Sequence, residues 1–382
     1  MHFPFCEAKC HYCDFFSFAE NKFALPARTK IYDAILKEWD VLNANFPNAH
    51  LNEPLETVFF GGGTPSLVPL GFIESLLQKL PRHADCEVTM EANPSSIDPA
   101  KASAWAKAGI TRISMGVQAL NDDRLKWLGR VHSKKQIFDA LESLRAAREV
   151  NPNFRVNIDY IVGVPNQTIS DIDGEIRELM NSHGDLIGHI SSYLLTLRPS
   201  SPWIKDLPSE EIQLDHLKAT DALLAELGFE HYEISNFARP GFRCGHNENY
   251  WLGKGYIGLG PSAHGFWRST NDSFRTKVWS NLEKYVDSVQ KGLLPWEWVE
   301  TLDPEQRRLE FLLLRLRRVS GFCIEEYNEE FDRDFLKENQ RTLPPLLKDG
   351  YIHLNHSEAG KTQLSLTSLG FFMSDEILKY LQ

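Results

Sequence analysis

The chain opens with three closely spaced cysteines, Cys6, Cys10 and Cys13, in a C-x3-C-x2-C pattern. Three thiolates so close in sequence can converge on three corners of one [4Fe-4S] cube. The other cysteines are scattered along the chain at Cys86, Cys244 and Cys323. Because no neighbouring cysteine supplies a fourth corner, the pattern predicts a cluster in which one iron stays open to a small ligand.

An open iron of this kind can chelate the amino and carboxylate groups of S-adenosylmethionine (SAM), and the cluster can then supply the electron that cleaves its C–S bond. A structural zinc site is the main alternative, because zinc takes four ligands in closed sites, and His2 or His11 could supply the fourth. A disulfide framework is disfavoured, since one of the three cysteines would be left over and a chain of this size needs no such staple.

Composition narrows the class of protein. The chain has 382 residues and 42% hydrophobic content, enough for one or two large cores. A net charge of -11 without a basic stripe argues against nucleic acid as a partner. No apolar run is long enough to span a membrane, and the first residues do not resemble a signal peptide. We therefore expect a cytoplasmic protein, in a reducing compartment that would also suit an iron–sulfur cluster.

Apolar segments alternate with amphipathic helical patterns over the first 200 residues or so. Helical spacing is clear at Ile31, Ile35, Trp39 and Leu42. Such alternation implies parallel strands joined by right-handed crossovers. The expected fold class is therefore α/β, with a partial (β/α)6 barrel. Its strands are predicted at Met1–Phe5, Leu55–Phe60, Cys86–Met90, Thr111–Val117, Arg155–Ile161 and His189–Leu195.

The pattern changes after about Ser200, which predicts three regions. Residues 1–205 would form the barrel, and residues 206–300 a connecting region that contains His246–Trp251. Residues 301–382 would form a smaller α+β region with a helix after Asp303 and two strands near the end. This order of elements predicts a winged-helix-like module.

Polar and glycine residues follow the predicted strands. The cysteines follow the first strand, Gly61–Pro65 the second and Glu91 the third, while Gln118 ends the fourth and Asp159 lies in the fifth. Parallel barrels build their sites at the carboxyl ends of strands, so we expect these residues to meet.

Each of these residues also has a simpler interpretation. The glycines allow close approach of a ligand, but they could form only a flexible turn. The carboxylate of Glu91 suits ribose hydroxyls, but it could be only a helix-terminal acid. Arg130 could be a surface cation. His246 lies between Gly245 and Gly253 and could bind haem or a metal, or only tie a loop by hydrogen bonds.

Together these residues resemble the oxygen-independent coproporphyrinogen III oxidase-like branch of the radical SAM family, nearly end to end. Within that branch, Cys13-Asp14-Phe15 and the His-Asn-x-x-Tyr-Trp stretch at 246–251 resemble the haem chaperone (HemW-type) sub-group. The oxidase carries another cysteine at the position of Phe15 and a longer N-terminal segment. The resemblance rests on the Cys motif, Gly61–Pro65, Ser114–Gln118, Asn157–Pro165, Tyr193 and Tyr232–Asn236.

The resemblance implies roles for individual residues. Cys6, Cys10 and Cys13 would hold the cluster and His246 would bind haem. SAM would contact Gly62, Gly63, Thr64 and Glu91, and a second SAM would match Gln118, Arg130 and Asp159. Implied partners are haem, haem-acceptor proteins and an electron donor such as a flavodoxin or ferredoxin, with haem docking near the mouth of the barrel.

The family usually has a Tyr upstream of the His-x-Pro-Phe-Cys start, and this Tyr is absent here. Two explanations stay open: either translation begins at an upstream codon, or the first strand is short and the cluster site is weaker.

The leading functional hypothesis is a SAM- and [4Fe-4S]-dependent haem chaperone, with SAM cleavage left open. The alternative is a coproporphyrinogen III oxidase of porphyrin biosynthesis, against which Phe15 and the short N-terminus speak. A radical SAM methyltransferase-like protein is a third reading.

Overall fold

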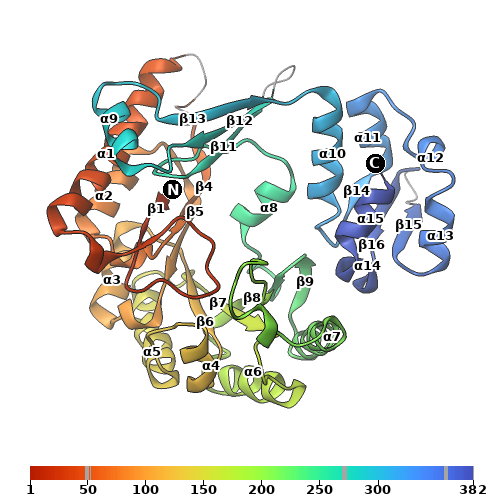
Figure 1. Cartoon of the computed structure of the whole chain (residues 1–382), viewed down its shortest axis with the longest axis horizontal. Coiled ribbons are helices and arrows are strands. Elements are labelled where there is room, and N and C mark those ends of the chain that lie inside the picture. Colours follow the sequence, from red (N-terminus) through yellow and green to blue (C-terminus); the bar gives the residue numbers. More distant parts are fainter. Residues whose placement is uncertain (48–50, 52, 269–272, 357–359, 382) are drawn as a thin grey trace.

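The computed structural model describes residues 1–47, 51, 53–268, 273–356 and 360–381. An eight-stranded sheet in the order β1-β4-β5-β6-β7-β8-β10-β9 organises the first 240 residues (Figure 1). The first six strands in this order are mutually parallel, which confirms the partial barrel. They are β1 (His2–Phe3), β4 (Leu55–Gly62), β5 (Arg82–Ala92), β6 (Arg112–Gln118), β7 (Arg155–Val162) and β8 (Ile187–Leu194).

Two antiparallel strands, β10 (Asn236–Ala238) and β9 (Glu230–Glu233), extend the sheet beyond β8. The short β2 (Phe5–Cys6) and β3 (Phe18–Ala19) pair with each other around the cysteine loop. Strand β5 begins earlier than predicted, because its polar start at Arg82 pairs with Leu55 before a register shift.

Amphipathic helices cover the outer face of the sheet. Ser133 and Thr168 start α5 and α6 with capping boxes, which satisfy free amide groups at each helix start. The apolar stripe of α5, with Ile137, Leu141 and Leu144, is completely buried. The helices of this region are α1 (Leu25–Asn45), α2 (Leu70–Lys79), α3 (Pro99–Ala108), α4 (Asp122–Trp127), α5 (Lys134–Val150), α6 (Ile169–His183) and α7 (Glu210–Glu226).

The two faces of each barrel strand differ in burial. Outward-facing Val58 and Phe60 are 4% and 0% exposed beneath the helices. Inward-facing Phe59, Glu91 and Asp159 are only partly buried. Because side chains alternate along a strand, this contrast identifies the barrel interior as the more accessible and more polar side.

After the barrel, helix α8 (Gly245–Trp251) leads into a second, antiparallel sheet of β11 (His264–Arg268), β12 (Ser273–Val278) and β13 (Trp296–Thr301). Helix α9 (Leu282–Gln290) follows β12 and packs on α1, where the Tyr285 hydroxyl donates a 2.7 Å hydrogen bond to the buried Glu38. Figure 1 shows α8 between the barrel strands and the C-terminal helices.

The C-terminal part has its own apolar core, which includes Leu312, Phe322, Tyr327 and Phe335. Its three short strands form an antiparallel sheet in the order β14-β16-β15. Its elements are α10 (Pro304–Arg315), β14 (Phe322–Cys323), α11 (Ile324–Phe331), α12 (Phe335–Glu338), α13 (Leu343–Lys348), β15 (Ile352–His356), β16 (Thr362–Leu366), α14 (Ser368–Phe372) and α15 (Ser374–Tyr380).

Backbone hydrogen bonds join this module to the barrel. The Ile234 amide donates to Arg317 O at 2.9 Å, and the Val319 amide donates to Tyr232 O at 3.1 Å. None of the described helices combines the length and apolar character needed to cross a bilayer.

Candidate functional site

The cysteine loop lies at the carboxyl end of the barrel strands. Phe3 and Phe5, only 1% and 2% exposed, fix its start in the core. Cys6 ends β2, and Cys10 and Cys13 follow in a turn closed by a 3.3 Å hydrogen bond from the Cys13 amide to Cys10 O. Burial raises the pKa of both Cys6 and Cys13. The three thiols therefore share one loop at this end.

Hydrogen-bond donors surround these sulfur atoms. The hydroxyls of Thr64 and Ser17 lie against Cys6 and partly offset the rise of its pKa. The Arg130 guanidinium donates to Cys10 Sγ at 3.5 Å. These donors are placed to hydrogen-bond the sulfur atoms when the cysteines bind iron as thiolates.

As the described residues lie, the cysteine thiols do not form a compact site for a single metal ion. Among the described residues, no three His, Cys, Asp or Glu side chains gather closely enough to hold one metal ion. Thiolates on three different irons of a cube lie farther apart than ligands of one ion. His2 Nε2 is hydrogen-bonded to Phe16 O, and His11 Nδ1 to Trp127 O. Both histidines that could complete a zinc site therefore already bond to backbone carbonyl oxygens.

The glycine turn packs tightly against the first strand. Gly62 has φ +105°, and a Cβ there would lie 2.7 Å from the His2 ring; a Cβ on Gly63 would lie 2.5 Å from Phe5 O. The amides of residues 61–64 all donate within the protein, that of Gly62 to Glu91 at 3.1 Å. A ligand can therefore meet this part of the backbone through carbonyl oxygens, which suit an ammonium group.

Two carboxyl groups face each other inside the barrel. Burial, and next the charge of Asp159, raise the pKa of Glu91 to about 8. Burial also raises the pKa of Asp159, against hydrogen bonds from Ser114 and Asn157. Like charge and low solvation both favour the protonated form of Glu91, and a cationic ligand beside the pair would shift it toward the ionised form.

Arg130 lies in the site rather than on the surface. Its Nη2 donates to Asn93 Oδ1 at 2.6 Å and to Gly116 O at 3.1 Å. A Cβ on Gly116 would lie 2.9 Å from Gln118 Nε2 and 3.0 Å from Arg130 Nη2, so the glycine makes room for both side chains. Gln118 has φ +68°, an uncommon backbone conformation for a residue with a side chain.

A cavity of about 640 Å³ adjoins the cysteine loop. Its far wall is the loop after β8, which the sequence analysis did not single out. His11 stacks on Trp203 with ring centroids 4.4 Å apart, and Arg198 pairs with Asp14 at 2.5 Å. Proximity to the carboxyl end of the sixth strand was the sequence signal that could have identified this loop.

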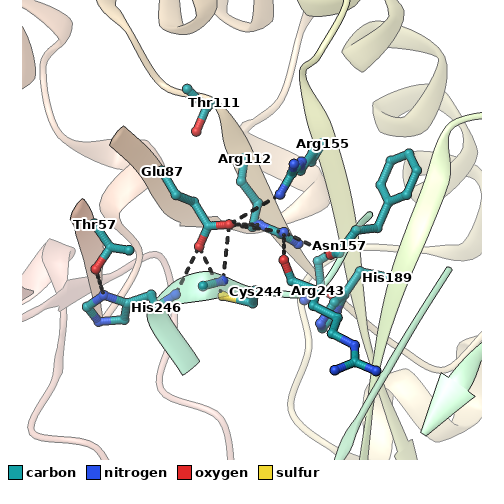
Figure 2. Close-up of polar contacts among 12 residues, drawn as sticks. Thr57, Glu87, Thr111, Arg112, Arg155, Asn157, His189, Arg243, Cys244 and His246 are labelled. Atoms are coloured by element: carbon teal, nitrogen blue, oxygen red, sulfur yellow. Dashed lines mark hydrogen bonds and ion pairs between the residues drawn. The ribbon is translucent and has the colours of Figure 1, made fainter. Parts of the chain in front are cut away.

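His246 occupies a different place from the predicted one. Its Nδ1 lies 2.8 Å from Thr57 Oγ1 (Figure 2). Its ring stacks on that of Phe59, with the two ring centroids 5.0 Å apart. Thr57 lies near the start of β4 and pairs with Glu87, so His246 sits at the amino-terminal end of the barrel. The expectation that haem docks near the mouth of the barrel does not fit this position of its predicted ligand, because residues 244–246 contact Glu87 at the amino-terminal end.

Burial lowers the pKa of His246 to about 4, so the imidazole is neutral at pH 7. Tyr250 meets its ring edge-on at 4.9 Å. The sequence analysis missed a polar network beside this segment, in which His189 contacts Asn157 at 2.5 Å and the Tyr232 hydroxyl at 2.7 Å. The network lies within a barrel whose two ends carry the two groups of candidate residues.

Comparisons with known proteins identify the family of the chain. A radical SAM superfamily model matches residues 1–179, and a HemN C-terminal domain model matches residues 302–372. The heme chaperone HemW of Haemophilus influenzae is 34% identical over 339 residues, which cover 86% of this chain and 84% of that protein. The heme chaperone HemW of Bacillus subtilis is 28% identical over 390 residues and is covered to 97%.

Among solved structures, the coproporphyrinogen III oxidase HemN of Escherichia coli, described as a radical SAM enzyme, superposes with a TM-score of 0.79 at 20% identity. The match covers 100% of this chain and 88% of that one, and it shows the shared fold. Fold and cysteine loop thus define a radical SAM protein. Within that superfamily, in its coproporphyrinogen III oxidase-like branch, the chain belongs to the HemW family.

Proposed function

We propose that this protein is a radical SAM haem chaperone, which binds haem within its barrel and passes it to acceptor proteins. The observation that carries the proposal is the environment of His246, a neutral imidazole held inside the barrel by Thr57. The name of the relatives, heme chaperone HemW, supports the same cargo.

His246 has the features of an axial ligand. Ligating histidines commonly engage their second nitrogen in a hydrogen bond that fixes the ring, and Nδ1 of His246 does so with Thr57. No hydrogen bond within the described residues occupies Nε2. In this proposal Nε2 binds the haem iron, and Tyr250 and Trp251 of α8 pack beside the macrocycle.

The cysteine end would serve the other cofactors. Cys6, Cys10 and Cys13 would hold a [4Fe-4S] cluster, which would bind SAM at its open iron and could supply an electron to it. Arg130 would help to hold the Cys10 sulfur in place, since it already donates a hydrogen bond to it. Contacts with SAM would come from Gly62, Gly63, Thr64 and Glu91, and with a second SAM from Gln118, Arg130 and Asp159.

The same proposal includes a haem acceptor and an electron donor such as a flavodoxin or ferredoxin. It places the protein in a reducing cytoplasm, because oxygen attacks a cluster with an open iron. Coproporphyrinogen oxidation is the competing activity, and Phe15, 63% exposed, stands where the oxidase has a further cysteine.

Anaerobic reconstitution followed by two separate assays tests the proposal. Haem titration should give a Soret band that shifts or weakens in His246→Ala but not in His353→Ala, a control at an exposed site. Unchanged spectra and affinity in His246→Ala would reject His246 as the ligand and direct the search to His264. Coproporphyrinogen decarboxylation at about 1 per second or faster would overturn the chaperone assignment.

A further inference from the structure

An ion pair between Glu87 and Arg112 lies at the amino-terminal end of the barrel, in contact with the segment that carries His246 (Figure 2). The Arg112 Nη2 and Glu87 Oε2 atoms are 3.1 Å apart, and the side chains are 1% and 12% exposed. Despite its burial Glu87 keeps a lowered pKa, because Arg112 and neighbouring donors outweigh desolvation. A buried ion pair contributes little net stability by itself. The other contacts of Glu87 and Arg112 therefore indicate what this pair does.

Glu87 binds the start of α8. Its carboxylate accepts hydrogen bonds from the His246 amide at 3.1 Å, the Gly245 amide at 3.3 Å and the Cys244 thiol at 3.3 Å. Helix α8 has no side-chain cap of its own. The unpaired amides at a helix start normally need such a partner, and here a carboxylate from strand β5 supplies it.

Arg112 binds the chain just before the helix. Its Nη2 donates to Phe242 O at 2.9 Å and to Arg243 O at 2.8 Å. Both members of the ion pair therefore contact the same five-residue stretch, one through its carbonyls and the other through its amides. The carbonyl contacts and the amide contacts together fix the depth of the stretch in the barrel and its rotation.

We propose that Glu87 and Arg112 are positioning residues that aim His246 Nε2 at the haem iron. The inference rests on the proposed function. Thr57 fixes the rotation of the imidazole ring, whereas the ion pair fixes the backbone from which the ring projects. The low-dielectric setting and the charge of Glu87 make these amide contacts stronger than those of a neutral acceptor.

Glu87→Gln is the informative variant, because it keeps the volume and one acceptor oxygen but removes the charge. Glu226→Gln is the matched control: Glu226 is exposed on α7, pairs with Arg177 at 2.8 Å and lies outside α8. Loss of a group that orients a ligand typically weakens metal binding about 10- to 100-fold. We expect that loss in haem affinity, with a shifted Soret band, for Glu87→Gln and none for Glu226→Gln.

A double-variant cycle separates positioning from general destabilisation. If Glu87 acts through His246, the Glu87→Gln change should alter haem affinity less than about twofold in the His246→Ala background. Equal losses in both backgrounds, or no loss in either, would overturn the inference.

Hydrogen exchange in the haem-free protein keeps the two proposals apart. The Gly245 and His246 amides should exchange faster in Glu87→Gln than in Glu226→Gln, and equal rates would overturn the anchoring role whatever haem does. Failure of the proposed function would instead appear as haem binding that His246→Ala leaves unchanged.

Discussion

Replacing Tyr232 by Phe removes one hydroxyl from a directional chain of hydrogen bonds through the barrel. The Cys244 amide donates to the Tyr232 oxygen at 3.2 Å, and the Tyr232 hydroxyl donates to His189 Nε2 at 2.7 Å. His189 Nδ1 then donates to Asn157 Oδ1 at 2.5 Å, and Asn157 Nδ2 donates to Asp159 at 2.9 Å. Burial holds the pKa of His189 well below its usual value, so the ring is neutral and this tautomer completes the chain.

The chain cannot rearrange to repair the loss. If His189 moved its proton to Nε2, its Nδ1 would face the acceptor oxygen of Asn157; if Asn157 flipped, Asp159 would lose a donor. The variant thus leaves the Cys244 amide and His189 Nε2 unpaired, in residues 3% and 1% exposed. Each buried unsatisfied group costs about 1–3 kcal/mol, which gives a loss of roughly 2–4 kcal/mol after partial relaxation.

Thermal unfolding measures this loss. At about 2–4 °C per kcal/mol for a domain of this size, the midpoint of the barrel transition should fall by roughly 4–16 °C. Tyr380→Phe is the control, because Tyr380 is 64% exposed and its loss should leave the midpoint unchanged. A fall of less than about 2 °C in Tyr232→Phe would refute the directional chain.

Two further predictions concern the two ends of the barrel. Changing Cys6, Cys10 or Cys13 singly to Ala should abolish the broad charge-transfer absorption of the reconstituted protein, and full retention of iron and sulfide in all three variants would contradict the cluster assignment. Burial lowers the pKa of His246 to about 4, below the 6.5 of a free imidazole, so protons should compete for Nε2 only near pH 4. The Soret band should therefore persist from pH 8 to about pH 5.5, and a midpoint near 6.5 would show a solvated ring.

Local patterns predicted the carboxyl end of the barrel well. Strand periodicity and parallel order placed Glu91, Gln118 and Asp159 at one end, and the structure brings them together around Arg130. These residues were accessible to prediction because parallel strands end on the same side, so position in a strand determines depth in the barrel.

The other end depends on contacts that no local pattern records. Side chains alternate between the two faces of a strand. The alternation that places Asp159 inside the barrel therefore also places Asn157 and Arg155 inside, and the sequence analysis did not use this signal. The pairing of Glu87 with the 244–246 segment joins residues more than 150 positions apart. No strand precedes His246 directly, so its depth in the barrel could not be derived from strand register.

The separation of the two ends leads to a last prediction, on competition between SAM and haem. From Thr57, beside His246, to Gly62, in the glycine turn, β4 advances by roughly 16 Å at 3.3 Å per residue. Haem held by His246 therefore does not need the space around Glu91 and the cysteines. Haem titrations of the cluster-loaded protein with and without saturating SAM should give the same binding stoichiometry, and SAM should not displace bound haem. Competitive displacement by SAM would mean that haem docks at the cysteine end, and it would exclude His246 as the ligand even if His246→Ala weakened binding indirectly.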